Sequence, residues 1–143
     1  MTQRRNELLD KITNKTVHVG VLGLGYVGLP LALVLLLGLS HNKDIDDTRE
    51  SPSFEIIEHR LHLGAIVSYH DPHIAKATPV RSWPNLPPMQ SVPLTPESIE
   101  AADAIVISTD HSAVDYAMLA KHARLIVDTR GVYREPRSNV IKA

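Results

Sequence analysis

Apolar and polar residues alternate along the chain in blocks that predict strands and helices following one another. The blocks that predict strands are residues 16–22, 34–40, 65–71, 104–109 and 124–128. The blocks that predict helices, from apolar positions at helical spacing or from helix-start residues, are 52–63, 96–102 and 112–123. Because strands alternate with helices, we expect an α/β fold in which a mainly parallel sheet is flanked by helices.

The helix expected at residues 52–63 has clear signals at both ends. Ser51 can cap its N-terminus, and Pro52 suits the first helical position, where the N–H of a helix has no partner in any case. Gly64 can end it. The later helix at 112–123 begins less sharply, and we expect Ser112 or Asp110 as its cap.

A proline-rich stretch separates the third expected strand from the second expected helix. Six prolines lie between Pro79 and Pro96, and they forbid a long helix. We expect a surface excursion with one short strand near residues 90–92. Trp83 is expected to pin this excursion to the body of the protein, and stacking on a ligand is the alternative role.

Composition excludes several classes of protein. The chain has 143 residues, with 15 Lys and Arg against 16 Asp and Glu, so it has no basic excess of the kind that binds nucleic acid. It has no cysteine, which excludes disulfides, thiolate metal sites and a cysteine nucleophile. A hydrophobic content of 43% suits a globular domain with an aliphatic core.

The run from Val17 to Leu39 raises the alternative of a membrane-tethered domain. It contains no Asp, Glu, Lys or Arg, it follows several basic residues, and it is long enough to span a bilayer. However, its first half holds four glycines and Pro30 in turn-like positions, and a parallel strand buried on both faces gives the same hydropathy. We therefore expect no membrane partner and a cytoplasmic location.

The same run contains three glycines at the spacing of a dinucleotide-binding turn. Gly23, Gly25 and Gly28 follow an alternating β-rich segment in G-x-G-x-x-G order, as in Rossmann-like folds. A complete βαβ unit needs about 30 residues or more, and too few follow before residue 39. Asp46 and Asp47 lie near the distance of the usual ribose-binding acid, but no helix and strand fit before them. We therefore expect a vestigial strand and turn.

Two segments of the chain resemble separate parts of one family. "VGVLGLGYVGLPLA" resembles the start of the UDP-sugar 6-dehydrogenases, whose N-terminal domain binds NAD. "LLLGLSHNKDIDDTRESPSFEIIE" resembles the start of their C-terminal, UDP-binding domain, and "VSYHDPHI", "AIVISTDHSAVDY" and "LIVDTRGVY" continue that pattern in order. The resemblance implies a remnant of the NAD-binding domain at 1–33, joined to a UDP-sugar-binding domain at 34–143.

The resemblance also implies a reaction. These enzymes oxidise the C6 alcohol of a UDP-sugar to a carboxylate with NAD, and a cysteine thiolate traps the aldehyde stage. The last two segments resemble the branch that acts on UDP-N-acetylhexosamines. Because the chain has no cysteine and the family's other catalytic residues lie in the part it lacks, we assign no catalytic residue and expect no activity from the chain alone.

The resemblance carries two sets of binding residues onto this sequence. For the cofactor they are Gly23, Gly25, Tyr26, Val27 and Gly28. For UDP or a UDP-sugar they are Asn42, Lys43 and Arg130, although Asn42 stands where the family has lysine. The guanidinium of Arg130 suits phosphate oxygens or a uracil carbonyl. The alternatives are a non-catalytic UDP-binding or interaction module, docking on a full-length relative, and a non-functional gene product.

Other constellations carry weaker predictions. Neither the pair His59 and His62 nor the group His70, Asp71 and His73 supplies enough ligands for a closed metal site, so we predict no metal. The consecutive residues 110–112 contain the side-chain types of a catalytic triad, but neighbours in sequence rarely form a relay. In the loop at 46–50 we expect Asp47 or Thr48, together with Arg49, to fix the loop by capping and ion pairing.

Overall fold

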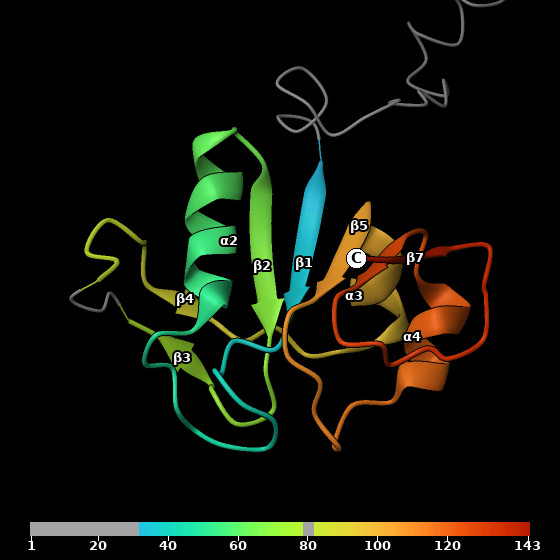
Figure 1. Ribbon diagram of the computed structural model, residues 1–143. Helices are drawn as coiled ribbons and strands as arrows, with labels where there is room; N and C mark the ends of the chain where they lie inside the picture. Colours follow the sequence, from blue (N-terminus) through green and yellow to red (C-terminus); the bar gives the residue numbers. More distant parts are fainter. Residues whose placement is uncertain (1–31, 79–81) are drawn as a thin grey trace, which may run out of the picture.

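The computed structural model describes residues 32–78 and 82–143. Its main element is a five-stranded sheet in the order β2-β1-β5-β6-β7, and every pair in it is parallel (Figure 1). The strands are β1 (Leu33–Leu37), β2 (Ile66–His70), β5 (Ala104–Ile107), β6 (Ile126–Asp128) and β7 (Val140–Lys142). The predicted α/β, Rossmann-like fold with a mainly parallel sheet is confirmed.

Helices cover both faces of this sheet. On one face α2 (Pro52–His62) packs Phe54 and Ile57 against Leu36 of β1. On the other face α3 (Pro96–Ala101) and α4 (Tyr116–His122) pack against the neighbouring β1 side chains Leu35 and Leu37. Because successive strand residues point to opposite faces, a strand between two helical layers must be apolar at every position. This explains the unbroken sequence "LVLLL" of β1.

The helix ends follow the local signals of the sequence. The Ser51 side chain accepts from Ser53 N at 3.2 Å, Pro52 occupies the first turn, and Gly64 follows with φ +84°. The predicted start of the last helix is wrong. Asp115 caps α4, and Ser112 lies in the loop before it, where its N–H and hydroxyl bind Asp44 instead.

The proline-rich excursion is anchored as predicted. It contains a small antiparallel pair, β3 (Lys76–Ala77) and β4 (Met89–Gln90), so the expected short strand lies close to its predicted position. Half-buried Trp83 packs into the cluster of Phe54 and Ile57, which confirms its pinning role. Strand β7 was not predicted, because its residues are partly exposed and carry little apolar pattern.

Several predictions fall on residues outside the described part. These are the glycine turn with its cofactor residues, most of the apolar run 17–39, and nearly all of the expected N-terminal remnant at 1–33. Within 32–78 and 82–143, no helix has the length and apolar character needed to cross a membrane. Residues 33–37 of the apolar run form β1, which lies between β2 and β5 in the sheet.

Candidate functional site

The strand order places a topological switch point beside β1. The chain passes from β1 through α2 to β2 on one side, whereas β5 pairs with the other side of β1 and leads on to β6. In parallel α/β sheets, ligands bind beyond the carboxyl ends of the strands at such a point. The loops after β1, β2, β5 and β6 meet there, at the lower end of the sheet in Figure 1. This edge is the candidate site.

Buried Asp71, directly after β2, organises the edge. Its Oδ2 accepts from the N–H groups of Leu39 and Ser40 at 2.7 and 3.0 Å, which lie in the loop after β1. Its Oδ1 accepts from the N–H groups of His73 and Ile74 at 2.8 and 3.0 Å. Burial opposes ionisation, but these N–H donors outweigh it and lower the pKa of the Asp71 carboxyl. One carboxylate therefore ties two loops together.

Buried His111 ties the loop after β5 to the same group. Its Nδ1 accepts from the N–H of Asp44 at 3.0 Å, so this nitrogen has no hydrogen of its own. Nε2 therefore carries the ring hydrogen, and it lies 3.2 Å from Asp71 Oδ2 and 3.1 Å from Ser40 Oγ. The bonds on the two ring nitrogens fix a neutral tautomer and a single orientation of the imidazole.

Lys43 crosses the switch point. Its Nζ lies 2.9 Å from Asp110 Oδ2, which joins the loop after β1 to the loop after β5. The hydrogen bond to Asp110 raises the pKa of the Lys43 ammonium. The Lys43 side chain is 52% exposed, so this cation is accessible to an anion from solvent. Asn42 is also exposed at the tip of the same loop.

Arg130 lies after β6 and contacts the same β5 loop. Its Nε donates to the carbonyl of Ser108, and its N–H donates to Asp128 Oδ1 at 3.0 Å. Buried Asp128 also accepts from Tyr133 N at 2.9 Å. Burial alone would raise the pKa of Asp128, but the surrounding N–H donors lower it. The contacts described for the exposed Arg130 guanidinium involve Nε alone, and its terminal nitrogens suit an anion.

The loops after β1 and β5 touch directly below this edge. Gly38 has φ +85°, and a Cβ built there would lie 2.2 Å from the carbonyl oxygen of Thr109. Ser53 Oγ donates to the Gly38 carbonyl at 2.9 Å and lies 2.7 Å from Ser108 Oγ. Thr109 Oγ1 donates to the Ser40 carbonyl at 2.7 Å. Glycine is required because no larger residue fits between the loops.

The ion pair predicted in the loop after β1 is confirmed. Arg49 donates to Asp47 from its backbone N–H, Nε and Nη2, at 3.0, 2.9 and 2.7 Å. This pairing lowers the pKa of Asp47 to about 2. Both groups shape their own loop.

The triad-like residues have three separate sets of partners. Asp110 pairs with Lys43, Ser112 binds Asp44, and His111 faces Asp71. They therefore form no relay with one another. Of the residues considered for metal binding, His70 is engaged through Nδ1 by the carbonyl of residue 92. What the sequence did not indicate is that Asp71 and His111 form the scaffold of the edge.

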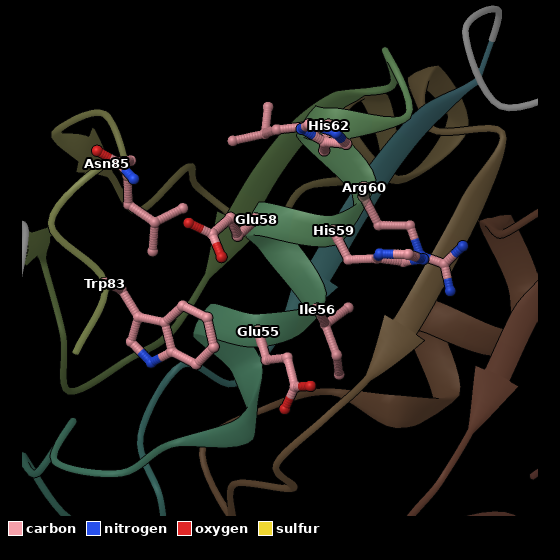
Figure 2. Close-up of a pocket in the computed structure, with 10 residues that line it drawn as sticks. Glu55, Ile56, Glu58, His59, Arg60, His62, Trp83 and Asn85 are labelled. Carbon is pink, nitrogen blue, oxygen red and sulfur yellow. The ribbon is translucent and has the colours of Figure 1, made fainter.

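A separate groove of about 730 Å³ lies on the outer side of α2. Figure 2 shows Trp83 and Asn85 of the proline-rich segment opposite Glu55 and Glu58 of α2. His59 also lines this groove. None of the residues described at the carboxyl edge contributes to it, so the groove and the candidate site are distinct.

Residues 35–135 match the model of the UDP binding domain of the UDP-glucose/GDP-mannose dehydrogenase family. The UDP-N-acetyl-D-mannosamine dehydrogenase of Pyrococcus horikoshii is 30% identical over 110 residues, covering 73% of this chain and 23% of that protein. The NDP-N-acetyl-D-galactosaminuronic acid dehydrogenase of Ralstonia nicotianae is 31% identical over 112 residues, covering 73% of this chain and 24% of that protein. The chain thus spans about a quarter of the length of these relatives.

Solved structures show the same fold. The UDP-D-ManNAc dehydrogenase of Pyrococcus horikoshii superposes with a TM-score of 0.60 at 23% identity, over 96% of this chain and 28% of that one. The NDP-N-acetyl-D-galactosaminuronic acid dehydrogenase of Methanosarcina mazei gives a TM-score of 0.57 at 21% identity, over 99% of this chain and 36% of that one. The family resemblance read from the sequence is confirmed by the family match.

Proposed function

The chain belongs to the UDP-glucose/GDP-mannose dehydrogenase family, and we propose that it binds UDP or a UDP-sugar at the carboxyl edge of its sheet. The observation that carries this proposal is that two cations from different loops contact one short loop. Lys43 reaches Asp110, and Arg130 reaches Ser108 two residues earlier. Both positive groups therefore flank the switch point, where parallel sheets bind nucleotides.

The diphosphate of the ligand would replace polar contacts that form within the protein when no ligand is bound. A phosphate oxygen would compete with Asp110 for the Lys43 ammonium, which is half-exposed. The terminal nitrogens of Arg130 would donate to phosphate or to a uracil carbonyl, while Nε stays on the Ser108 carbonyl and holds the plane of the guanidinium. Asn42, on the same loop as Lys43, would add a neutral hydrogen-bonding group.

The sugar of this nucleotide is proposed to be an N-acetylhexosamine. Relatives from Pyrococcus and Methanococcus are named for UDP-N-acetyl-D-mannosamine, and the one from Ralstonia for an N-acetylgalactosaminuronic acid. The full reaction by family would be NAD-dependent oxidation of the sugar C6 alcohol. We propose that these 143 residues do not perform it alone, because the thioester route needs a thiolate and they contain no cysteine. Oxidation would need an NAD site and a thiolate from outside these 143 residues.

Calorimetric titration of the chain with UDP tests the binding proposal. We expect saturable binding that weakens about 10- to 100-fold in Arg130→Ala or Lys43→Ala, since a hydrogen bond to a charged group contributes about 1.5–3 kcal/mol. Arg124→Ala is the matched control. Arg124 also carries an exposed guanidinium, but it pairs with Asp103 at 3.1 Å before the amino end of β6. The proposal fails if the folded chain does not bind UDP, or if both site variants bind like the control.

A spectroscopic assay tests the catalytic part separately. The chain is mixed with NAD and UDP-N-acetylmannosamine, and NADH absorbance is followed. We expect no NADH from the chain alone. Sustained NADH formation by the purified chain would contradict the proposal that these 143 residues are inactive alone, whatever the UDP titration shows.

A further inference from the structure

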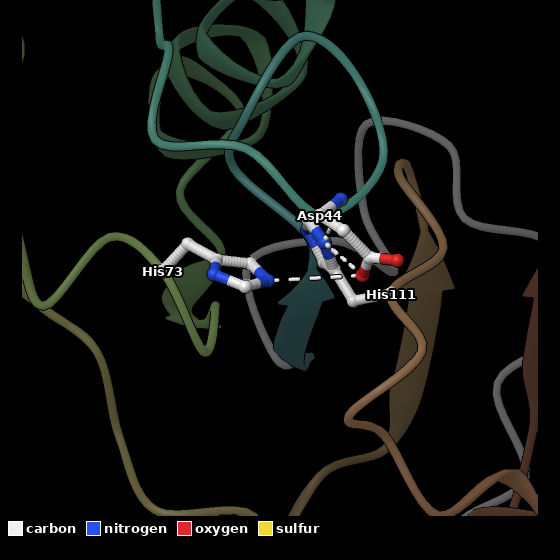
Figure 3. Close-up of side chains that lie close together, drawn as sticks. All are labelled: Asp44, His73 and His111. Carbon is white, nitrogen blue, oxygen red and sulfur yellow. Dashed lines mark hydrogen bonds and ion pairs between the residues drawn. The ribbon is translucent and has the colours of Figure 1, made fainter.

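We propose that Asp44, His73 and His111 form a binding site for a divalent transition metal of the zinc class. The three residues come from the loops after β1, β2 and β5, and one ligand atom from each lies within 4.8 Å of the other two (Figure 3). Two imidazoles and a carboxylate are a donor set that suits Zn²⁺. The site uses neither Lys43 nor Arg130, so it can be tested without UDP.

The buried ligand is already oriented as a metal-binding histidine. Nε2 of His111 lies 3.2 Å from the carboxylate of Asp71, so the ring hydrogen is on that side. The lone pair of Nδ1 accepts from the N–H of Asp44 at 3.0 Å, and Asp44 Oδ1 lies 3.6 Å from the same nitrogen. A carboxylate behind a ligating imidazole is the outer-shell partner that metal sites use to fix the tautomer and raise its basicity.

The carboxylate ligand is held in place too. Asp44 has φ +56°, which aspartate tolerates better than most residues. Its two oxygens accept from the N–H and hydroxyl of Ser112, both at 2.7 Å. These two bonds fix the position of the carboxylate.

The third ligand, His73, comes from the loop after β2. His73 Nε2 lies 3.7 Å from Asp44 Oδ1, and the centroids of the two imidazole rings are 5.1 Å apart. The N–H of His73 donates to Asp71 Oδ1 at 2.8 Å, so the carboxylate that orients His111 also anchors the backbone of His73. Figure 3 shows the three side chains together, with the ion pairs to the Asp44 carboxylate drawn as dashed lines.

Metal binding would require a local rearrangement. Atoms bonded to a tetrahedral Zn²⁺ at about 2.0–2.1 Å lie about 3.3 Å apart, so the separations of Asp44 Oδ1 from His111 Nδ1 and from His73 Nε2, 3.6 and 3.7 Å, would close by a few tenths of an ångström. The N–H of Asp44 now donates to His111 Nδ1 at 3.0 Å, so its peptide group would have to rotate away from this nitrogen to admit the ion. Asp44 and His73 have side chains 37% and 33% exposed, so an ion can enter and solvent can take the fourth position.

Titration of the untagged full chain with Zn²⁺ tests the site. We expect one ion to bind per chain, with at least about tenfold weaker affinity in His73→Ala, because the loss of even an outer-shell partner costs about 10- to 100-fold. Asp44→Asn should weaken it similarly while keeping the bonds to Ser112. The matched control is the double variant His59→Ala/His62→Ala, which removes two exposed histidines from α2. Mg²⁺, which prefers oxygen ligands, should not compete.

Co²⁺ gives a readout of the ligand set itself. We expect visible absorption typical of low-coordinate Co²⁺ with the native chain and the control, and none with His73→Ala. The proposal is overturned if Zn²⁺ does not bind, if His73→Ala and Asp44→Asn bind as tightly as the native chain, or if the control loses the ion. Thermal melting of each variant without metal checks that the fold is intact, and His73 is exposed enough that we expect an unchanged melting temperature.

Discussion

Replacing Asp71 with asparagine tests whether one buried carboxylate holds the loops of the site together. In the native chain, Oδ1 serves the N–H groups of His73 and Ile74, and Oδ2 serves those of Leu39 and Ser40 and the ring of His111. Asparagine has almost the same shape but only one acceptor oxygen. Whichever way the asparagine amide is oriented, its NH₂ group replaces a carboxylate oxygen that accepts from N–H groups in the native chain.

The size of the effect follows from these contacts. With the oxygen kept toward Leu39, Ser40 and His111, the N–H groups of His73 and Ile74 lose their acceptor. That of Ile74 is buried, and an unsatisfied buried donor costs about 1–3 kcal/mol. The other bonds also weaken, because charge-assisted hydrogen bonds are about twice as strong as neutral ones. The neutral amide avoids the cost of burying a charge, so we expect a net loss of about 3 kcal/mol.

Urea unfolding followed by circular dichroism measures this loss. A loss of about 3 kcal/mol is a large part of the ~5–15 kcal/mol that stabilises a domain. Asp46→Asn is the control, because the Asp46 carboxylate is exposed and has no hydrogen bond or ion pair to the described residues. We expect the control to stay within about 0.5 kcal/mol of the native chain. If Asp71→Asn differs from it by less than about 1 kcal/mol, the scaffold argument is wrong.

The pH dependence of the same variant gives a second test. The folded-state pKa of Asp71 lies below the ordinary value of 3.8, so the folded state binds its proton less readily than the unfolded state. The stability this provides is therefore present above the unfolded pKa of about 3.9 and is lost as the pH falls through the folded pKa. The Asp71→Asn variant has no carboxylate at this position and therefore no such stabilisation to lose. The difference in unfolding free energy between the native chain and the variant should therefore narrow below about pH 4.

Two further substitutions test the contact between the loops after β1 and β5. Gly38→Ala should destabilise the fold by more than about 3 kcal/mol, because its Cβ would meet the Thr109 carbonyl at 2.2 Å. Gly131→Ala is the comparison: Gly131 also has a positive φ, +69°, but it has open space around it, so the substitution should cost only about 1–2 kcal/mol. Thermal melting distinguishes them, and equal losses would contradict the steric argument. Ser53→Ala should cost about 1–2 kcal/mol in urea unfolding, because it leaves buried Ser108 without its side-chain partner, and an unchanged midpoint would refute this.

Much of the fold could be predicted because the signals that define its elements are local. The strand "LVLLL" is apolar at every position because both faces are covered, and Ser51, Pro52 and Gly64 mark the ends of α2 within a few residues of the chain. Where local signals conflict or fade, prediction failed. Ser112 looks like a helix cap, but Asp44 takes its N–H and hydroxyl, and the cap is Asp115.

The candidate site, like the fold, could be predicted only in part from the sequence. The sequence, through its family resemblance, pointed to Asn42, Lys43 and Arg130 as ligands of UDP, and that role stays a prediction. In the structure, Lys43 contacts the loop after β5 at Asp110, and Arg130 contacts it at Ser108. The sequence could not show that Asp71 binds His111, 40 residues away, or that both act through the same loops.

By itself, the sequence determined the fold class, the family and the absence of a thiol, because alternating apolar blocks, ordered motifs and residue counts are properties of the chain as written. The tertiary structure alone decided which side chains share a site. Asp44 and His111 lie 67 residues apart in the sequence, and no local signal near either residue indicates a contact with the other. They meet because parallel strands bring all their carboxyl ends to one edge, and the order of those strands is set by packing between distant segments.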